Sequence, residues 1–238
     1  MPQKPNFASI QLALFFKDAI TTPEDLWPEL KATDFVKTFD ETPLIIPLSE
    51  DPEYDTAPTV TLTSKNSAHR ALIARRRADL FWLASDNDER ELDGMKEGFH
   101  NLMKIFFEKV SGRMDIIRLG YVLKFFFESD KPESQIVNLL SADAKNPHGE
   151  GNLHEASVKI VTRVKMEGME INNNSSLSRG EKKTKDGKVS GIILTRDFNT
   201  IPERKEVLSW EQVLSLCTAI EGKLNLDRFQ ALLWPSAE

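Results

Sequence analysis

The sequence predicts an α+β protein in which an antiparallel sheet, or two such sheets, is packed by long amphipathic helices. Groups of strand-like segments, with apolar residues at every second position, are each followed by a segment with apolar residues three and four apart. Strands and helices do not alternate one by one, which argues against a parallel, doubly wound fold. The order of strands then long helix occurs twice, without a repeat in the residues themselves. We therefore expect either two similar halves or one continuous domain.

The composition is that of a folded protein with few special chemical groups. Of 238 residues, 40% are hydrophobic and 29% are charged, and the net charge is −6. An acidic chain is a poor match for binding nucleic acid or anionic membranes over its whole surface. Cys217 is the only cysteine, so no internal disulfide can form. The apolar N-terminal stretch is interrupted at Gln11 and Lys17 and is too short to span a membrane. We expect a cytoplasmic protein that does not attach to membranes.

The N-terminal third of the chain is expected to be mainly β-structure. Residues 9–17 alternate between apolar and other residues, which predicts a half-buried strand. A short helix is expected after Thr22, where a capping residue precedes a proline. Residues 42–49 and 59–64 are strand-like, and the two prolines in the first of them favour a sheet edge or a bulge. Residues 70–84 predict one or two further strands.

The middle of the chain contains the clearest helix and the clearest strand. From Glu89 to Val110 apolar residues recur three and four apart, which predicts an amphipathic helix that ends at Gly112. Residues 114–129 then alternate, and a short helix is expected up to Leu140. The apolar face of the strand holds Ile117, Leu119, Tyr121, Leu123, Phe125 and Phe127. Its mixed face holds Arg118, Gly120, Val122, Lys124 and Phe126, a division typical of antiparallel sheets.

A linker is predicted at residues 142–152, which are rich in glycine, asparagine and charge. It would separate an N-terminal α+β half, 1–141, from a C-terminal α+β half, 153–238. Residues 158–166 predict a strand, and residues 171–191 predict a polar loop with an Asp-Gly turn signal.

The end of the chain predicts one more strand and two helices. Residues 191–201 are strand-like, and the spacing from Ser209 to Gln212 is that of a capping box. The helix that this box opens places Cys217 on its apolar face, so we interpret this residue as a core thiol. A last helical run is expected to end at Trp234.

A cluster of basic residues is the candidate for nucleic-acid binding. It consists of Arg70, Arg75, Arg76, Arg77, Lys182, Lys183 and Lys185. Phe81 and Trp82 would supply stacking faces nearby. In an extended segment, however, Arg76 points away from its two neighbours, and acidic residues between positions 86 and 97 offset the arginine charge. The lysines join the cluster only if the fold brings them close to the arginines.

Metal and carboxylate chemistry have weaker candidates. His148, Glu150, His154 and Glu155 match no dependable zinc spacing, so a polar linker is preferred to a metal site. Asp197 lies in an apolar strand beside Arg196, where an ion-paired structural carboxylate is the more common outcome. The sequence contains no nucleotide-binding, serine-hydrolase or zinc-protease motif. We therefore expect no catalytic residues, no metal and no cofactor.

Two strand-like segments carry a resemblance to known proteins. The motifs IIRLGYVLKFF and ILTRDFNTIPE, in this order of elements, resemble a sporadically distributed bacterial family of uncharacterised proteins of about this length. The matching positions are Arg118, Leu119, Gly120, Tyr121, Asp197 and Phe229. The chain departs from the family after Gly120, where an extra arginine is missing. The resemblance implies no activity, and the patchy distribution of the family is associated with defence or toxin-linked genes.

The leading hypothesis is a non-catalytic module of the bacterial cytoplasm that binds another protein, as a component of a defence or toxin-linked system. It would use the mixed face of residues 115–127, with Arg118, Lys124 and Phe126, or an edge strand by sheet augmentation. Phe15 and Phe126 fall on nominally polar strand faces, which raises the further expectation of a homo-oligomer. The alternatives are a nucleic-acid-binding protein that uses the arginine cluster and a carboxylate-based enzyme around Asp197.

Overall fold

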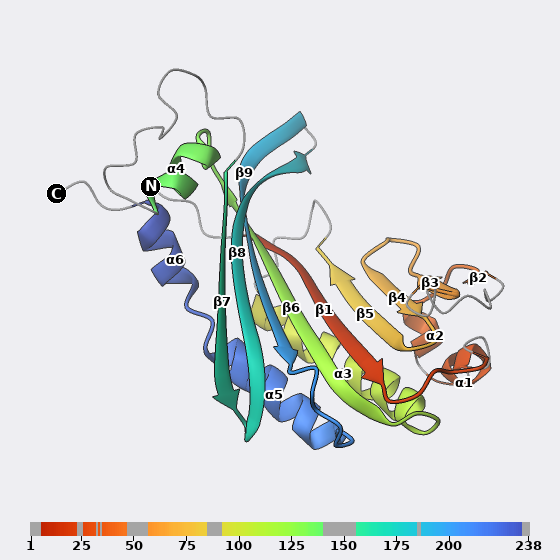
Figure 1. Ribbon diagram of the computed structural model, residues 1–238. Helices are drawn as coiled ribbons and strands as arrows, with labels where there is room; N and C mark the ends of the chain where they lie inside the picture. Colours follow the sequence, from red (N-terminus) through yellow and green to blue (C-terminus); the bar gives the residue numbers. More distant parts are fainter. Residues whose placement is uncertain are drawn as a thin grey trace.

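Nine strands form one antiparallel sheet in the order β2-β3-β4-β5-β1-β6-β9-β8-β7 (Figure 1). The computed structural model describes residues 6–22, 26–31, 33, 35–46, 57–84, 92–139, 156–184 and 187–234. The strands are β1 (Asn6–Phe16), β2 (Leu44–Ile45), β3 (Val60–Thr63), β4 (His69–Ile73), β5 (Arg77–Leu83), β6 (Ile116–Glu128), β7 (Ser157–Met166), β8 (Met169–Thr184) and β9 (Gly187–Thr200). The helices are α1 (Leu26–Lys31), α2 (Phe35–Thr38), α3 (Leu92–Ser111), α4 (Pro132–Asn138), α5 (Trp210–Gly222) and α6 (Leu226–Leu233). The predicted mixed fold with an antiparallel sheet is confirmed.

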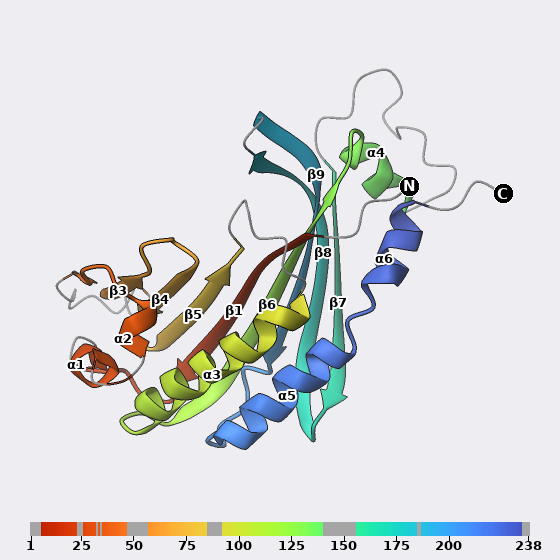
Figure 2. The same cartoon turned by 180° about the vertical axis from the view of Figure 1, so that it is seen from behind.

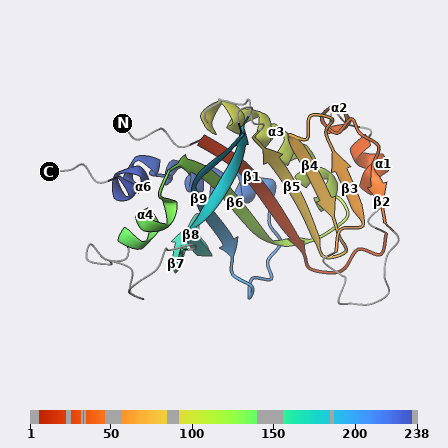
Figure 3. The same ribbon diagram turned by 90° about the horizontal axis from the view of Figure 1, so that it is seen from above.

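The helices lie against one face of this sheet, and in Figure 2 α3 and α5 lie in front of its central strands. Seen from above, α1 and α2 lie at the end of the sheet that carries β2 and β3, and α4 and α6 lie toward the opposite end (Figure 3). Fully buried apolar side chains fill the space between sheet and helices, among them Leu12, Phe99, Phe106, Tyr121 and Leu216. We call the other face of the sheet the open face, because no helix of the described residues covers it.

The central strands β1 and β6 follow the alternation that the sequence predicts. In β6, Leu119, Tyr121 and Phe125 are buried toward the helices. The prediction is wrong at the start of the strand, where Ile116 and not Ile117 is fully buried. The reason is a register shift, because Phe16 pairs with Ile116 whereas Phe15 pairs with Arg118. The extra residue in β6 moves Ile117 out of the alternating pattern.

The polar segment 171–191 is not a loop, and this prediction is wrong. It forms most of β8 and the start of β9, which pair with each other over fourteen residues. Ile171 and Leu177 of β8 are buried toward the helices, whereas asparagine and serine occupy the alternate positions. Asparagine and serine disfavour isolated strands, but β8 is paired on both sides, with β7 and with β9. Thr184 pairs with Gly187, and the predicted Asp-Gly turn stays a prediction because Asp186 lies outside the described residues.

The turn between β7 and β8 also has a clear local cause. Met166 pairs with Met169, so only Glu167 and Gly168 connect the two strands. Both connecting residues have positive φ, 48° and 76°, as a two-residue hairpin turn of type I′ requires. This tight turn holds β7 as the last strand of the sheet.

The C-terminal helices begin as the sequence predicts. The hydroxyl of Ser209 accepts a hydrogen bond from the backbone N–H of Gln212, whose side chain accepts one from the backbone N–H of Ser209. Cys217 is fully buried on the apolar face of α5, as expected of a core thiol. The predicted linker, 142–152, lies outside the described residues, so the division into two halves stays a prediction. The strands on either side of it meet in one sheet through the pairing of β6 with β9.

Candidate functional site: the open face and the free edge of the sheet

A row of one aromatic and two basic side chains crosses the open face. Phe15 of β1 pairs with Arg77 of β5 on one side and with Arg118 of β6 on the other. Both guanidinium groups lie over the Phe15 ring, at 5.0 Å and 4.8 Å from its centroid. Such cation–π contacts are worth about 0.5–2 kcal/mol each. Phe15 is half-buried by this arrangement, so no second chain is needed to explain an aromatic residue on this face.

The two arginines of the row differ in their electrostatic partners. Arg77 donates from Nε and Nη2 to both carboxylate oxygens of Asp79, at distances of 2.7–3.0 Å. Gln11 also donates to Asp79, at 2.8 Å. Among the described residues Arg118 has no such ion pair, and its buried Nε has no hydrogen-bond partner. Burial lowers the pKa of Arg118, and the charge of Glu203 partly opposes this effect. Arg118 is therefore the less neutralised cation of the row.

Asp197 of β9 lies in a polar group on the open face. It accepts hydrogen bonds from the side-chain amides of Asn174, at 3.3 Å, and Asn199. Arg196 points to the opposite face, where its guanidinium lies over the Phe198 and Phe229 rings. The expected ion pair between neighbours is therefore absent, and amides satisfy the carboxylate. In the part of the chain that the structure describes, no three metal-ligating side chains gather at one place.

The basic residues of the candidate nucleic-acid site lie at two ends of the sheet (Figure 1). Arg75 and Arg76 lie in the turn between β4 and β5, close to the pairing of Phe15 with Arg118. Lys182 and Lys183 lie near the tip of the β8–β9 hairpin, beyond the pairing of Glu128 with Gly191. The ten steps along β6 from Arg118 to Glu128 alone span about 33 Å. The fold therefore does not bring these lysines to the arginines.

The remaining predicted residues are distributed over several places. Arg70 is exposed on β4, and Lys124 is exposed on the open face of β6. Phe126 is buried, because it lies over Gly191, where an added Cβ would come within 2.5 Å of the ring. Lys185 and the segment 148–155 lie outside the described residues. Of the two phenylalanines on polar faces, Phe126 is thus buried within the chain and Phe15 is half-buried.

The outermost strand β7 exposes apolar side chains on both faces. Ile160, on the face that the helices cover elsewhere, is 58% exposed, and Val161, on the open face, is 59% exposed. The strand is ten residues long, contains no proline and pairs with β8 without a register shift. Among the described residues nothing pairs with its outer edge. Sequence reasoning named an edge strand without identifying it. Val161 was the available signal, because it interrupts an otherwise basic face.

The opposite edge of the sheet has a different design. There β2 has only two residues, Leu44 and Ile45, which are 58% and 50% exposed. Pro43 precedes this strand and Pro47 follows two residues after it. Proline has no N–H to donate, and a two-residue strand offers little backbone for pairing. The predicted edge position of this segment is confirmed, and its shape disfavours pairing with a further strand.

A buried polar cluster joins the sheet to both long helices. Tyr121 of β6 donates its hydroxyl proton to Glu221 of α5, and His100 Nε2 of α3 lies 3.0 Å from the same carboxylate oxygen. Burial raises the pKa of Tyr121 well above its ordinary value, and the neighbouring Cys217 and Glu221 add to this effect. Burial likewise raises the pKa of the Cys217 thiol. A protonated buried thiol is a poor nucleophile, so this cluster has a structural role.

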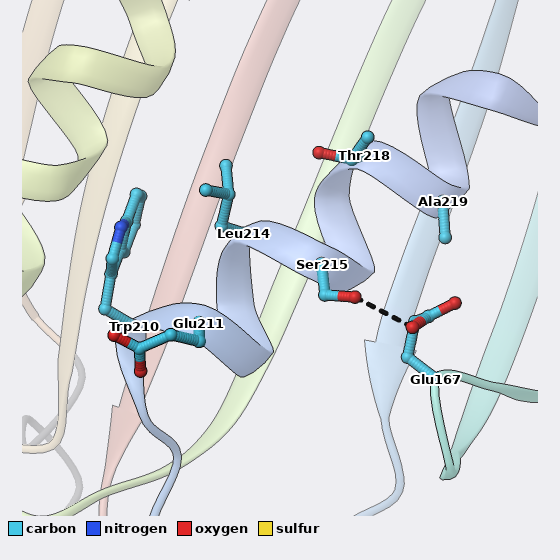
Figure 4. Close-up of a pocket in the computed structure, with 7 residues that line it drawn as sticks. All are labelled: Glu167, Trp210, Glu211, Leu214, Ser215, Thr218 and Ala219. Carbon is cyan, nitrogen blue, oxygen red and sulfur yellow. Dashed lines mark hydrogen bonds between the residues drawn. The ribbon is translucent and has the colours of Figure 1, made fainter.

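A shallow hollow of about 560 Å³ lies along α5 (Figure 4). Trp210, Leu214 and Ala219 line it from the helix, and Glu167 approaches from the β7–β8 turn. The Ser215 hydroxyl donates to the Glu167 carboxylate at 2.8 Å. Its lining also includes Glu211, Ser215 and Thr218. A side-chain hydrogen bond with Ser209 is the main cause that lowers the pKa of the exposed Glu211 carboxyl. The hollow is a shallow contact surface beside β7.

Comparisons with known proteins add no relative to this description. No protein-family model matches the chain, and no curated protein matches it. The bacterial family resemblance seen in the sequence therefore stays a prediction. No helix within the described ranges is both long and apolar enough to cross a membrane.

Proposed function

We propose that this chain is a non-catalytic binding module that accepts an extended segment of another protein along the outer edge of β7. One observation carries the proposal: a ten-residue edge strand exposes Ile160 and Val161 by more than half on its two opposite faces. An incoming strand would pair with the free backbone groups of this edge and cover both side chains. Within this proposal the chain acts in the cytoplasm, as its composition predicts.

Two kinds of group on the β7 edge would gain stabilisation from a bound segment: its backbone hydrogen-bonding groups and its exposed apolar side chains. Alternate residues of an edge strand direct their N–H and C=O groups away from the sheet, where only water satisfies them. Fully burying a valine or isoleucine side chain contributes about 1.5–3 kcal/mol, so the exposed halves of Ile160 and Val161 leave about 1 kcal/mol each to gain. Pairing with an extended segment provides both contributions at once, which a flat polar surface does not.

The rest of the molecule supports such an edge. The tight Glu167–Gly168 turn fixes β7 to β8, and β8 pairs with β9 over fourteen residues. We include in the proposal that the long amphipathic helices α3 and α5 keep the sheet in shape while its edge is used. The nucleic-acid alternative has less support, because Arg77 is already paired with Asp79 and the lysines lie at the other end of the sheet.

The experiment is affinity capture from the native cytoplasm with nuclease treatment, comparing three forms of the full chain. The edge-blocked variant carries Ile160→Asp and Val161→Asp, because aspartate is depleted in strands, opposes further pairing and adds no positive charge to an edge that already carries Lys159 and Arg163. The matched control carries Val207→Asp, since Val207 is also apolar and 50% exposed but lies outside the sheet. We expect one protein to be retained by the wild type and the control and lost by the edge-blocked variant.

Two results would contradict the proposal. Retention of the same protein by the edge-blocked variant would place the contact elsewhere on the molecule. Loss of all captured material after nuclease treatment would favour the nucleic-acid alternative. Thermal unfolding of the three forms shows whether each variant is still folded, and we expect midpoints within a few degrees because all three side chains are exposed.

A further inference from the structure

We infer that the segment bound by β7 is acidic, with two carboxylates four residues apart and an apolar residue midway between them. This inference rests on the proposed function and specifies the chemistry of the partner. It is carried by the side chains of β7 that flank Val161 on the open face, Lys159 and Arg163.

Lys159 and Arg163 are exposed cations without acidic partners among the described residues. Both lie on the open face, where β8 places Ser176 opposite Lys159 and Asn172 opposite Arg163. Neither of these neighbours carries a charge. The third base of the strand, Lys165, differs, because Glu170 lies opposite it. No acidic residue occurs in β7 itself. The free edge is therefore locally positive in a chain whose net charge is −6.

Each residue of an added strand would lie opposite one residue of β7, so the side chains of β7 determine which residues are favoured at each position. Residues opposite Lys159 and Arg163 are four apart on the new strand and lie on the same face, about 13 Å from each other. The residue midway between them lies opposite Val161, which favours an apolar side chain. On the other face, the residues beside Ile160 meet a second exposed apolar side chain. The resulting pattern is acidic, any, apolar, any, acidic.

A second copy of this chain fits the edge less well. Two antiparallel β7 strands centred on Val161, with their open faces on the same side, would place Lys159 of each copy opposite Arg163 of the other. Centred on Thr162, they would place Lys159 opposite Lys165. Like charges directly opposite destabilise a strand pair. The same basic residues thus oppose self-association and favour an acidic partner.

The size of the expected charge effect follows from cross-strand pairs in sheets. An opposite-charge pair contributes about a 1.4- to 5-fold change in affinity, so two independent pairs contribute about 2- to 30-fold. Exposed pairs are screened by salt, so most of this factor should disappear at high ionic strength. The main-chain pairing and the apolar contacts should remain.

The test is a selection of random ten-residue peptides displayed on phage against the immobilised full chain at low salt. Parallel selections use the edge-blocked variant and a charge-reversed variant, Lys159→Glu with Arg163→Glu. A further control, Lys183→Glu with Lys205→Glu, makes the same change in net charge at exposed lysines outside β7. Enriched peptides are then synthesised, and their affinities are measured by fluorescence anisotropy at low and high salt.

The inference predicts enrichment of peptides with two acids four apart around an apolar residue. Their affinity should fall by at least about 2- to 30-fold on charge reversal in β7, because reversal removes two attractive pairs and creates two repulsive ones, and it should stay unchanged in the control. The edge-blocked variant should not bind them. The inference is overturned, and the proposed function left intact, if the enriched peptides lose binding to the edge-blocked variant but lack the acidic spacing and bind the charge-reversed variant as tightly as the wild type. If no peptide binding depends on the edge, both are overturned. The inference is also overturned if the wild-type chain forms a dimer that the edge-blocked variant does not form, because the edge then binds a second copy of the chain.

Discussion

Replacing Tyr121 by phenylalanine removes one hydroxyl from the cluster that joins β6, α3 and α5. This hydroxyl is fully buried and donates to Glu221, whose carboxylate is itself buried and otherwise contacts His100. The ring keeps its shape in the variant, so the packing of the core should not change. The carboxylate, however, loses a hydrogen-bond donor that water cannot replace. The substitution therefore isolates the energetic role of this single bond.

The expected loss is that of a buried hydrogen bond to a charged group, about 1.5–3 kcal/mol. For a chain of this size each kcal/mol lowers the unfolding midpoint by about 2–4 °C, so the variant should melt about 3–12 °C below the wild type. Differential scanning calorimetry at pH 7 measures this shift. A midpoint within 1 °C of the wild type would show that the hydroxyl does not stabilise the cluster.

The same substitution should change how stability depends on alkaline pH. Burial raises the pKa of Tyr121 in the folded chain well above its ordinary value of about 10, so above that pH the unfolded chain loses a proton that the folded chain keeps. The free energy of unfolding then falls by about 1.4 kcal/mol for each pH unit from this group, and its full contribution is present only below pH 10. Denaturant titrations from pH 9 to 11.5 should show a shallower decline in Tyr121→Phe. Identical slopes would refute the assignment.

Three further outcomes are expected from the described contacts. Gly191→Ala should lower the free energy of unfolding by about 1–3 kcal/mol, because the added Cβ would clash with the carbonyl oxygen of Phe127. Gly222→Ala is the control, because an added Cβ there meets nothing within 4 Å. Equal melting midpoints for the two variants would contradict this prediction. Ser209→Ala should cost about 0.5–2 kcal/mol through the lost cap of α5, measured by denaturant unfolding, and an unchanged free energy would show that the cap is not needed. Burial raises the pKa of Cys217, so maleimide should label it only at the rate of unfolding; rapid labelling of the folded chain would show that the thiol is accessible.

Local patterns in the sequence predict the elements that carry their own periodicity. The alternation in residues 114–129 identifies β6, and the Ser209–Gln212 spacing identifies the start of α5. The error at Ile116 arises from a register shift that only the pairing with β1 reveals. The strand β8 was missed for a related reason. Its asparagine, serine and lysine residues have low strand propensity, and pairing on both sides overrides that propensity.

Most of the candidate site depended on information that no local pattern contains. The edge position of β7 follows from the strand order, in which β7 pairs with β8 alone and ends the sheet. The separation of Arg75 from Lys182 likewise requires the register of the central strands. Tyr121 and Glu221 are 100 residues apart in sequence, so their contact is visible only in the folded chain. The signal that could have been read is Val161 within a basic strand face.

The unequal edges of the sheet limit how many partners one molecule can take. When both edge strands of a sheet are free to pair, each molecule can pair with one neighbour at each edge, and the molecules can assemble into a fibre. Here β7 presents ten residues, whereas β2 presents two between flanking prolines. A strand added to β7 therefore finds no equivalent acceptor at the far end. The expected complex has one segment per chain and stops there, so the geometry favours a closed 1:1 stoichiometry over chain-like propagation.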